Sequence, residues 1–95
     1  PNAFDCSGLT SYAWRKAGVR IPRVAAAQYR RIKKKISWNR LQPGDLLFFH
    51  GLGHVGMYVG DGKWIHSPRS GERVRIERLS GYRKRTFVGA VRPGL

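Results

Sequence analysis

The chain has 95 residues, with 19 Lys and Arg against 5 Asp and Glu, so its formal net charge at pH 7 is +14. This length fits one domain with a single core, and a hydrophobic content of 41% favours a folded globule over disorder. No apolar run approaches the roughly 20 residues that a transmembrane helix needs, and the N-terminus lacks the pattern of a signal peptide.

The first third of the chain predicts two helices. From Ser7 to Lys16 apolar residues recur at helical spacing, and Gly18 is a suitable stop. After Pro22 a second helical stripe reaches Ile36, with basic residues on either side of it. We therefore expect a second helix with a strongly basic outer face. The stripe consists of Ala25, Tyr29, Ile32 and Ile36.

From residue 41 onward the pattern predicts strands. A turn signal at 41–45 leads into the apolar run 46–49, which is typical of a buried strand. Two short runs, 54–59 and 63–67, flank Gly60-Asp61-Gly62 and indicate a hairpin. Alternation around 74–76 and an apolar segment at 86–91 predict two further strands. Helices followed by strands indicate an α+β fold with helices on one face of an antiparallel sheet.

The chain has one cysteine, Cys6, directly before the first predicted helix. A single cysteine excludes an internal disulfide and a thiolate-rich zinc site, so the thiol serves either packing or chemistry. At the start of a helix the dipole and the unpaired amides favour negative charge on sulfur and on an oxyanion. This position makes Cys6 a candidate nucleophile.

A cysteine nucleophile needs a histidine base and a polar group that orients the base. His54 and His66 lie on the two strands of the predicted hairpin, and the turn decides whether they meet. A two-residue loop would place them on opposite faces. A three-residue loop pairs Gly56 with His66 and sets His54 diagonally beside it, so the mechanism requires this longer loop or an equivalent bulge. The third histidine, His50, lies in a predicted loop and is the weaker candidate for the base.

Four motifs, taken in order along the chain, resemble the NlpC-type, papain-like cysteine peptidases, which cut the peptide stems of bacterial peptidoglycan. They are Phe4-Asp5-Cys6-Ser7-Gly8-Leu9, Leu41-Gln42-Pro43-Gly44-Asp45-Leu46, Gly53-His54-Val55-Gly56-Met57-Tyr58-Val59-Gly60 and Lys63-Trp64-Ile65-His66-Ser67-Pro68. The segment Ile21-Pro22-Arg23 and Gln28 also match places where the family has a similar Pro-Arg and Gln.

The resemblance implies a papain-like fold with the cysteine at the start of a helix and the two histidines on adjacent strands. It implies cleavage of the D-γ-glutamyl to diaminopimelate bond, or of its lysine equivalent, through a thioester on Cys6. It implies no metal and no cofactor, and it makes Asp5 and Ser7 weaker candidates for binding the stem. The family also has a Tyr and a glycine pair before the nucleophile. We therefore expect residues 1–95 to be a single catalytic domain without an N-terminal portion of the family domain.

Two alternatives to the peptidase remain open: a wall-binding module whose catalytic groups are idle, and an amidase or acyltransferase on the same scaffold. The charge of +14 favours acidic cell-wall polymers as partners besides peptidoglycan. Specific nucleic-acid binding is not expected, because no recognition helix or aromatic RNA-binding motif is present. The resemblance implies a monomer that is secreted, periplasmic or associated with the bacterial wall.

Overall fold

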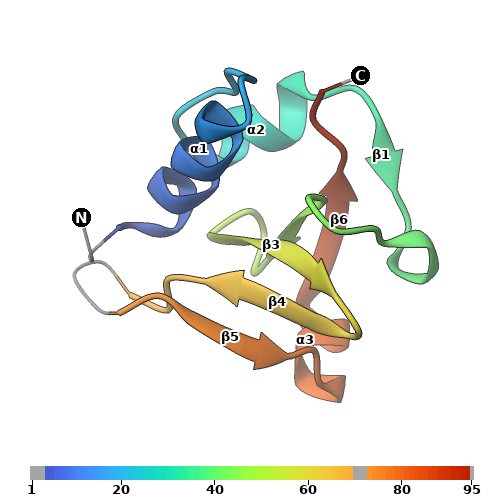
Figure 1. The fold of residues 1–95 in the computed structure, drawn as a ribbon. Coiled ribbons are helices and arrows are strands. Elements are labelled where there is room, and N and C mark those ends of the chain that lie inside the picture. Colours follow the sequence, from blue (N-terminus) through green and yellow to red (C-terminus); the bar gives the residue numbers. More distant parts are fainter. Residues whose placement is uncertain (1–3, 70–72, 95) are drawn as a thin grey trace.

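The computed structural model describes residues 4–69 and 73–94, and within these residues helices pack on an antiparallel sheet (Figure 1). The expected α+β class is therefore confirmed. The strands lie in the order β1-β6-β2-β3-β4-β5, and every neighbouring pair is antiparallel. The strands are β1 (Lys35–Ile36), β2 (Leu46–Phe49), β3 (His54–Gly60), β4 (Lys63–His66), β5 (Arg75–Arg78) and β6 (Phe87–Val91). The helices are α1 (Cys6–Lys16), α2 (Ala25–Arg31) and α3 (Gly81–Thr86), and a short 3-10 helix covers Trp38–Arg40.

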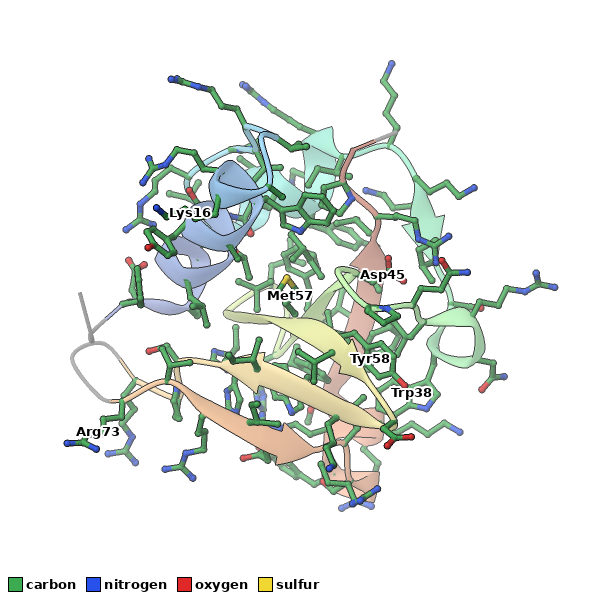
Figure 2. All side chains as sticks on the ribbon, viewed as in Figure 1. Lys16, Trp38, Asp45, Met57, Tyr58 and Arg73 are labelled. Atoms are coloured by element: carbon green, nitrogen blue, oxygen red, sulfur yellow. The ribbon has the colours of Figure 1, made fainter. Side chains whose placement is uncertain are left out.

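Strand β2 lies inside the sheet and is buried on both faces, which explains its continuous apolar sequence. Leu46 and Phe48 point into a cluster that is covered by α1 and α2. Leu47 and Phe49 point to the opposite face, where they meet Trp64 and several partly buried aromatic side chains. Figure 2 shows one of these, Tyr58, on the side of the sheet away from α1. The sheet therefore separates two apolar clusters.

The second helix is shorter than its apolar stripe predicts, because α2 ends at Arg31 and residues 35–36 form strand β1. Ile36 pairs with Ala90 of β6 and is buried there instead of on a helix. The Lys35 ammonium donates to the carbonyl groups of Tyr29 and Ile32, and it thereby gives a hydrogen-bond donor to carbonyl groups at the end of α2. A further helical turn would also bring Lys34 and Lys35 beside Arg30 and Arg31, four positions earlier, and like charges at this spacing destabilise a helix.

The hairpin between β3 and β4 has the expected alignment but not the expected loop. Gly60 pairs with Lys63, so the turn contains only Asp61 and Gly62, and both have positive φ, at 59° and 72°. A bulge between Tyr58 and Gly60 then inserts one residue into β3. The prediction of a three-residue loop was wrong, and the bulge that was its alternative restores the required register.

Two elements near the C-terminus differ from the predicted pattern. Residues 81–86 form helix α3, which the sequence analysis did not predict, and β6 starts at Phe87 instead of Thr86. Ser80 begins α3, since its hydroxyl accepts a hydrogen bond from the Arg83 amide at 3.4 Å. This short helix brings Arg83 back over the face of the sheet that carries Trp64.

Candidate active site

Cys6 is the first residue of α1, which starts one position earlier than the predicted start at Ser7. The Asp5 carboxylate caps the helix by accepting a hydrogen bond from the Gly8 amide at 2.7 Å. Gly8 itself is needed, because a Cβ there would lie 2.5 Å from the Asp5 carboxylate. Cys6 is partly buried and packs against the apolar cluster under α1. The cap therefore fixes where the helix starts and with it the place of the thiol.

Asp5 and Ser7, the predicted substrate-binding residues, flank Cys6 and share a partner. The Arg23 guanidinium lies 3.0 Å from the Asp5 carboxylate and donates to the Ser7 hydroxyl at 3.1 Å. The hydrogen bond from Arg23 to the Asp5 carboxylate, at 3.1 Å, and the charge of Arg23 hold the pKa of Asp5 below its usual value. Gln28, fully buried on α2, donates to the Ser7 carbonyl at 3.2 Å. The two residues that flank the thiol are thus held by Arg23, which lies between α1 and α2, and by Gln28 of α2.

His54 and His66 meet as the expected mechanism requires. His54 Nε2 lies 2.8 Å from His66 Nδ1, and the two rings are nearly perpendicular, with centroids 5.0 Å apart. Trp64 stacks on His66 at 3.9 Å and contacts His54 edge-on. A Cβ at Gly56 would lie 2.3 Å from the Trp64 ring and 2.8 Å from His66 Cβ. The absent side chain of Gly56 therefore leaves room for the Trp64 ring and for the Cβ of His66.

Both histidines titrate below their ordinary value. Burial, together with the nearby His66, Arg83 and His50, lowers the pKa of His54 to about 4, while Glu77 acts in the opposite sense. Burial also lowers the pKa of His66, although Glu77 acts in the opposite sense. At neutral pH both rings are therefore uncharged, which is the state that a proton acceptor needs.

The thiol and the histidines are connected through the segments beside them. The Ser67 hydroxyl, directly after His66, donates to the Phe4 carbonyl at 2.5 Å. Helix α1 lies against β3, and Figure 1 shows its start at the same edge of the molecule as the end of β4. No hydrogen bond among the described residues joins Cys6 to His54. The fold brings the segments of the three residues together, and direct contact is confirmed only for the two histidines.

His50 is less suited to be the base. It lies in an exposed turn with φ at 53°, and its Nε2 is 3.3 Å from the Tyr82 hydroxyl. Its ring therefore contacts an exposed tyrosine and not a buried orienting group.

Two residues that lie beside the histidines, Glu77 and Arg83, were not predicted from the sequence. Glu77 Oε2 is 3.4 Å from His66 Nε2, and Glu77 Oε1 is 3.3 Å from Arg83 Nε. A signal was present, since Glu77 is the one acid in the basic segment 73–78. Its pairing opposite Trp64 could not be inferred without the register of β5.

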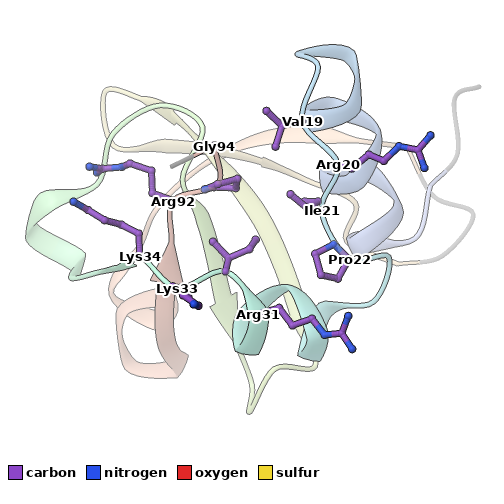
Figure 3. A pocket seen from close by; sticks show the side chains of 11 residues that line it. Val19, Arg20, Ile21, Pro22, Arg31, Lys33, Lys34, Arg92 and Gly94 are labelled. Carbon is purple, nitrogen blue, oxygen red and sulfur yellow. The ribbon is translucent and has the colours of Figure 1, made fainter.

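A pocket of about 510 Å³ lies away from the histidines, between the segments around Ile21, Ile32 and Pro93. Figure 3 shows cationic side chains at its rim that diverge, with Arg20 and Arg31 extending to one side and Lys34 and Arg92 to the other. The rim is therefore not arranged to enclose a single anion. Within residues 4–69 and 73–94, no group of three His, Cys, Asp or Glu side chains is placed to hold a metal ion. No helix in this part of the chain is long and apolar enough to cross a membrane.

Comparison with known proteins places this arrangement in a family. The model of the NlpC/P60 family matches residues 1–92. The chain belongs to the NlpC/P60 family. It is 46% identical over 97 residues to the murein DD-endopeptidase MepH of Escherichia coli, a match that covers 94% of this chain and 36% of MepH. The structure of an NlpC/P60 family protein from Bacillus cereus is 41% identical, with a TM-score of 0.81 over 94% of this chain and 31% of that protein. The papain-like fold is thereby confirmed.

The structures of RipA, a Resuscitation Promoting Factor Interacting protein, are also similar, and they carry mutations at three positions. RipA is 29 to 30% identical, with TM-scores of 0.80 to 0.81 over 95% of this chain and 43% of RipA. The mutated residues are a cysteine, a histidine 49 positions later and a glutamate 12 positions after the histidine. This chain spans less than half the length of each of these relatives.

Proposed function

We propose that this NlpC/P60 chain is a cysteine endopeptidase that hydrolyses the peptide stems of peptidoglycan, with Cys6 as nucleophile, His54 as general base and His66 as the orienting residue. The 2.8 Å contact between His54 Nε2 and His66 Nδ1 carries this proposal, because it leaves His54 Nδ1 as the free nitrogen for the thiol. The endopeptidase name of MepH supports the reaction class.

The spacing of the three mutated residues in RipA supports the same assignment. In this chain His54 follows Cys6 by 48 positions and His66 follows His54 by 12, nearly the spacing in RipA. His66 would then stand where RipA has a glutamate, and both side chains can accept a hydrogen bond from the base.

The reaction would proceed by acyl transfer in two stages. His54 Nδ1 takes the thiol proton as sulfur attacks the scissile carbonyl carbon and forms a tetrahedral oxyanion. The protonated His54 then gives this proton to the leaving amine, the C–N bond breaks, and a thioester remains on Cys6. In the second stage water loses a proton to His54 and attacks the thioester, which releases the carboxylic acid and returns the proton to sulfur. The amides of Cys6 and Ser7, in the first helical turn, are candidate donors to the oxyanion.

Asp5 and Ser7 are proposed to bind the stem peptide. Both lie beside the nucleophile, and both are held by Arg23. A carboxylate is suited to an ammonium or amide donor of a stem residue, and a hydroxyl accepts or donates. Their fixed positions would orient the scissile bond toward the sulfur.

Two bonds in the stem are candidates for cleavage. The family resemblance favours the bond from D-γ-glutamate to diaminopimelate or lysine. The name of MepH favours instead a bond between two D-configured centres, as in a cross-link between stems. Digestion of purified walls of known stem composition, followed by mass spectrometry of the products, distinguishes the two bonds by the mass of the released fragments.

The test of the proposed reaction uses three variants in that digestion. Cys6→Ala and His54→Ala should abolish release of peptide fragments while their circular dichroism stays that of the wild type. The matched control is His50→Ala, which removes an exposed histidine and should leave release unchanged. Full release by either active-site variant would reject the assignment. Binding to walls without any release by the wild type would favour the idle wall-binding module instead.

The molecule that accepts the acyl group in the second stage, water or an amine, distinguishes hydrolysis from acyl transfer. A hydrolase yields a free carboxylic acid, whereas an acyltransferase passes the acyl group from Cys6 to an added amine. Products from digestion with and without a primary amine would show which occurs, and amine adducts in place of acids would favour the acyltransferase.

The partners and the place of action follow from the same proposal. We propose that the chain acts at the bacterial wall, outside the cytoplasm, because that is where its substrate lies. Its charge of +14 would draw it to the acidic polymers of the wall. Figure 2 shows nitrogen-tipped side chains that project in many directions, among them Lys16 at the helices and Arg73 beside the sheet.

A further inference from the structure

The His66 ring is fully buried, and its two nitrogens face different partners. Nδ1 lies 2.8 Å from His54 Nε2. Nε2 lies 3.4 Å from Glu77 Oε2, which is long for a hydrogen bond, and no closer partner for Nε2 exists among the described residues. A buried polar nitrogen needs a partner, and Glu77 is the group within reach.

We propose that Glu77 is a positioning residue that fixes the tautomer of both histidines and so aims the unprotonated nitrogen of His54 at Cys6. This inference rests on the proposed function for its catalytic meaning, but the tautomers themselves are a property of the resting protein.

The positions of the protons are set one after another from Glu77 to His66 and then to His54. An ionised carboxylate only accepts hydrogen bonds, so the His66 nitrogen that faces Glu77 must be the protonated one. A neutral His66 with a proton on Nε2 has a lone pair on Nδ1. His54 Nε2 must then carry its proton to donate to that lone pair. The remaining nitrogen of His54, Nδ1, is left without a proton and is the base.

Glu77 is held in its ionised form by the groups around it. Burial acts to raise the pKa of Glu77, but His66 and Arg83 lower it, and the net shift is downward. Arg83 binds the other carboxylate oxygen at 3.3 Å, and its guanidinium lies over the Trp64 ring at 4.9 Å. A second cation near His66 is Arg75 of strand β5, which pairs with His66 of β4. The carboxylate therefore stays charged and fixed between an arginine and the histidine.

A histidine in the orienting position requires such a neighbour. An ionised glutamate in that position can only accept a hydrogen bond from the base, so the direction of the hydrogen bond is set by its chemistry. A neutral imidazole at His66 can donate or accept through Nδ1, and the wrong choice places a proton on His54 where the thiol needs a lone pair. Glu77 removes this ambiguity from the far side of the ring.

The first test observes the tautomers directly. Protein labelled with nitrogen-15 at histidine is studied near pH 7.5 by long-range nitrogen–proton correlation spectra, with the His54→Gln and His66→Gln variants for assignment. We expect His66 to be protonated at Nε2 and His54 also at Nε2. Protonation of His66 at Nδ1 would overturn the proposal whether or not the protein cleaves peptidoglycan.

The second test replaces Glu77 by an isosteric amide. In Glu77→Gln the side-chain oxygen faces a choice between Arg83 and His66, and Arg83, which has only donors, should take it. The amide NH2 then faces His66 Nε2 and selects the opposite tautomer. We expect kcat to fall about 10- to 100-fold, in line with the loss of other groups that orient a catalytic histidine, with KM changed by less than about twofold.

Two controls separate positioning from a loss of charge or of folding. Asp61→Asn removes the same charge from the exposed β3–β4 turn, where asparagine tolerates the positive φ, and should keep wild-type kcat. Glu77→Asp keeps an acceptor-only group and should recover part of the activity. Equal kcat in Glu77→Gln and the wild type would contradict the proposal.

A double-mutant cycle then tests whether Glu77 acts through His66. In a His66→Gln background the orienting group has no tautomers, so adding Glu77→Gln should cause little further loss of kcat. A purely structural role for the ion pair with Arg83 would give the same loss in both backgrounds and would overturn the proposal. If Cys6→Ala still releases fragments, the proposed function fails while the predicted tautomers remain measurable, so the two failures are distinguishable.

Discussion

The substitution Gly56→Ala tests whether the packing around the histidine pair is as tight as the structure shows. Gly56 lies on β3, opposite the position of His66 in the register that the bulge restores. A Cβ at this position would lie 2.3 and 2.4 Å from two atoms of the Trp64 ring and 2.8 Å from His66 Cβ. Contacts below 3.0 Å require movement, and the Trp64 ring is fully buried and stacked on His66. One methyl group should therefore displace both rings.

The expected cost can be worked from this contact. Overpacking a buried site by one methyl group costs about 1 to 3 kcal/mol, and we expect the upper end because the Trp64 ring is enclosed by Phe49 and Arg83. In a domain of this size each kcal/mol shifts Tm by about 4 to 8 °C, so Tm should fall by roughly 10 to 20 °C. The displaced ring would also move His66 away from His54, and catalysis should fall more than stability explains.

Thermal and urea unfolding, followed by near-ultraviolet circular dichroism of tryptophan, provide the measurement. The matched control is Gly81→Ala at the start of α3, where the nearest atom to the added Cβ is the end of Arg85 at 3.6 Å. This control should be neutral or stabilise by up to about 1 kcal/mol. A wild-type Tm and wild-type activity in Gly56→Ala would show that the sheet relaxes at no cost and would refute the packing argument.

Three further results are expected. Because the pKa of His54 is lowered from 6.5 to about 4, the unfolded chain binds a proton between these pH values that the folded protein does not. Stability should therefore be constant above about pH 6.5 and fall by about 1 to 2 kcal/mol as the pH drops to 4, allowing for the solvent that reaches the half-buried ring, and a urea midpoint that stays level over this range would contradict the shift. Ser67→Ala should cost about 1 kcal/mol by removing the hydrogen bond to the Phe4 carbonyl and should slow cleavage, while unchanged kinetics would show that this bond does not position Cys6. Cleavage of whole walls should slow as salt rises from about 0.05 to 0.5 M because screening weakens the attraction of a +14 surface, and a soluble uncharged stem peptide should be cleaved at the same rate throughout.

The sequence predicted the parts of the fold whose signals are local. The first helix was predicted from Ser7 by the helical spacing of its apolar residues, one position after its observed start at Cys6, and the buried strand 46–49 follows from an uninterrupted apolar run. The sequence could predict that His54 and His66 share a face only if the hairpin has a longer loop or a bulge, because one residue more or less in the hairpin changes the face on which they lie. The Gly60-Asp61-Gly62 sequence permits either loop, and the choice falls on a two-residue turn with a bulge at Val59.

The parts that the sequence did not predict depend on pairing across the sheet. Ile36 continues a helical stripe, yet it is buried by pairing with Ala90, more than fifty residues away. Helix α3 has no apolar stripe of its own, and its place is set by the strands on either side. Glu77 resembles a surface acid until β5 is aligned with β4. Local propensity could not decide any of these positions, since each is stabilised by a partner that is remote in sequence.

The acidic residues explain how such a basic chain keeps both a fold and a site. Four of the five acids lie in the described part of the chain, and three of them bind a specific cation or amide. Asp5 caps α1 and binds Arg23, Asp45 is buried against Arg92 at 2.8 Å, and Glu77 lies between Arg83 and His66. Most Lys and Arg side chains are exposed, and they far outnumber the four acids of the described residues, so the positive field belongs to the surface while three of these acids are placed where position matters. Charge reversal on the surface should therefore alter attraction to the wall, whereas loss of a single one of these three acids should alter the fold or the site.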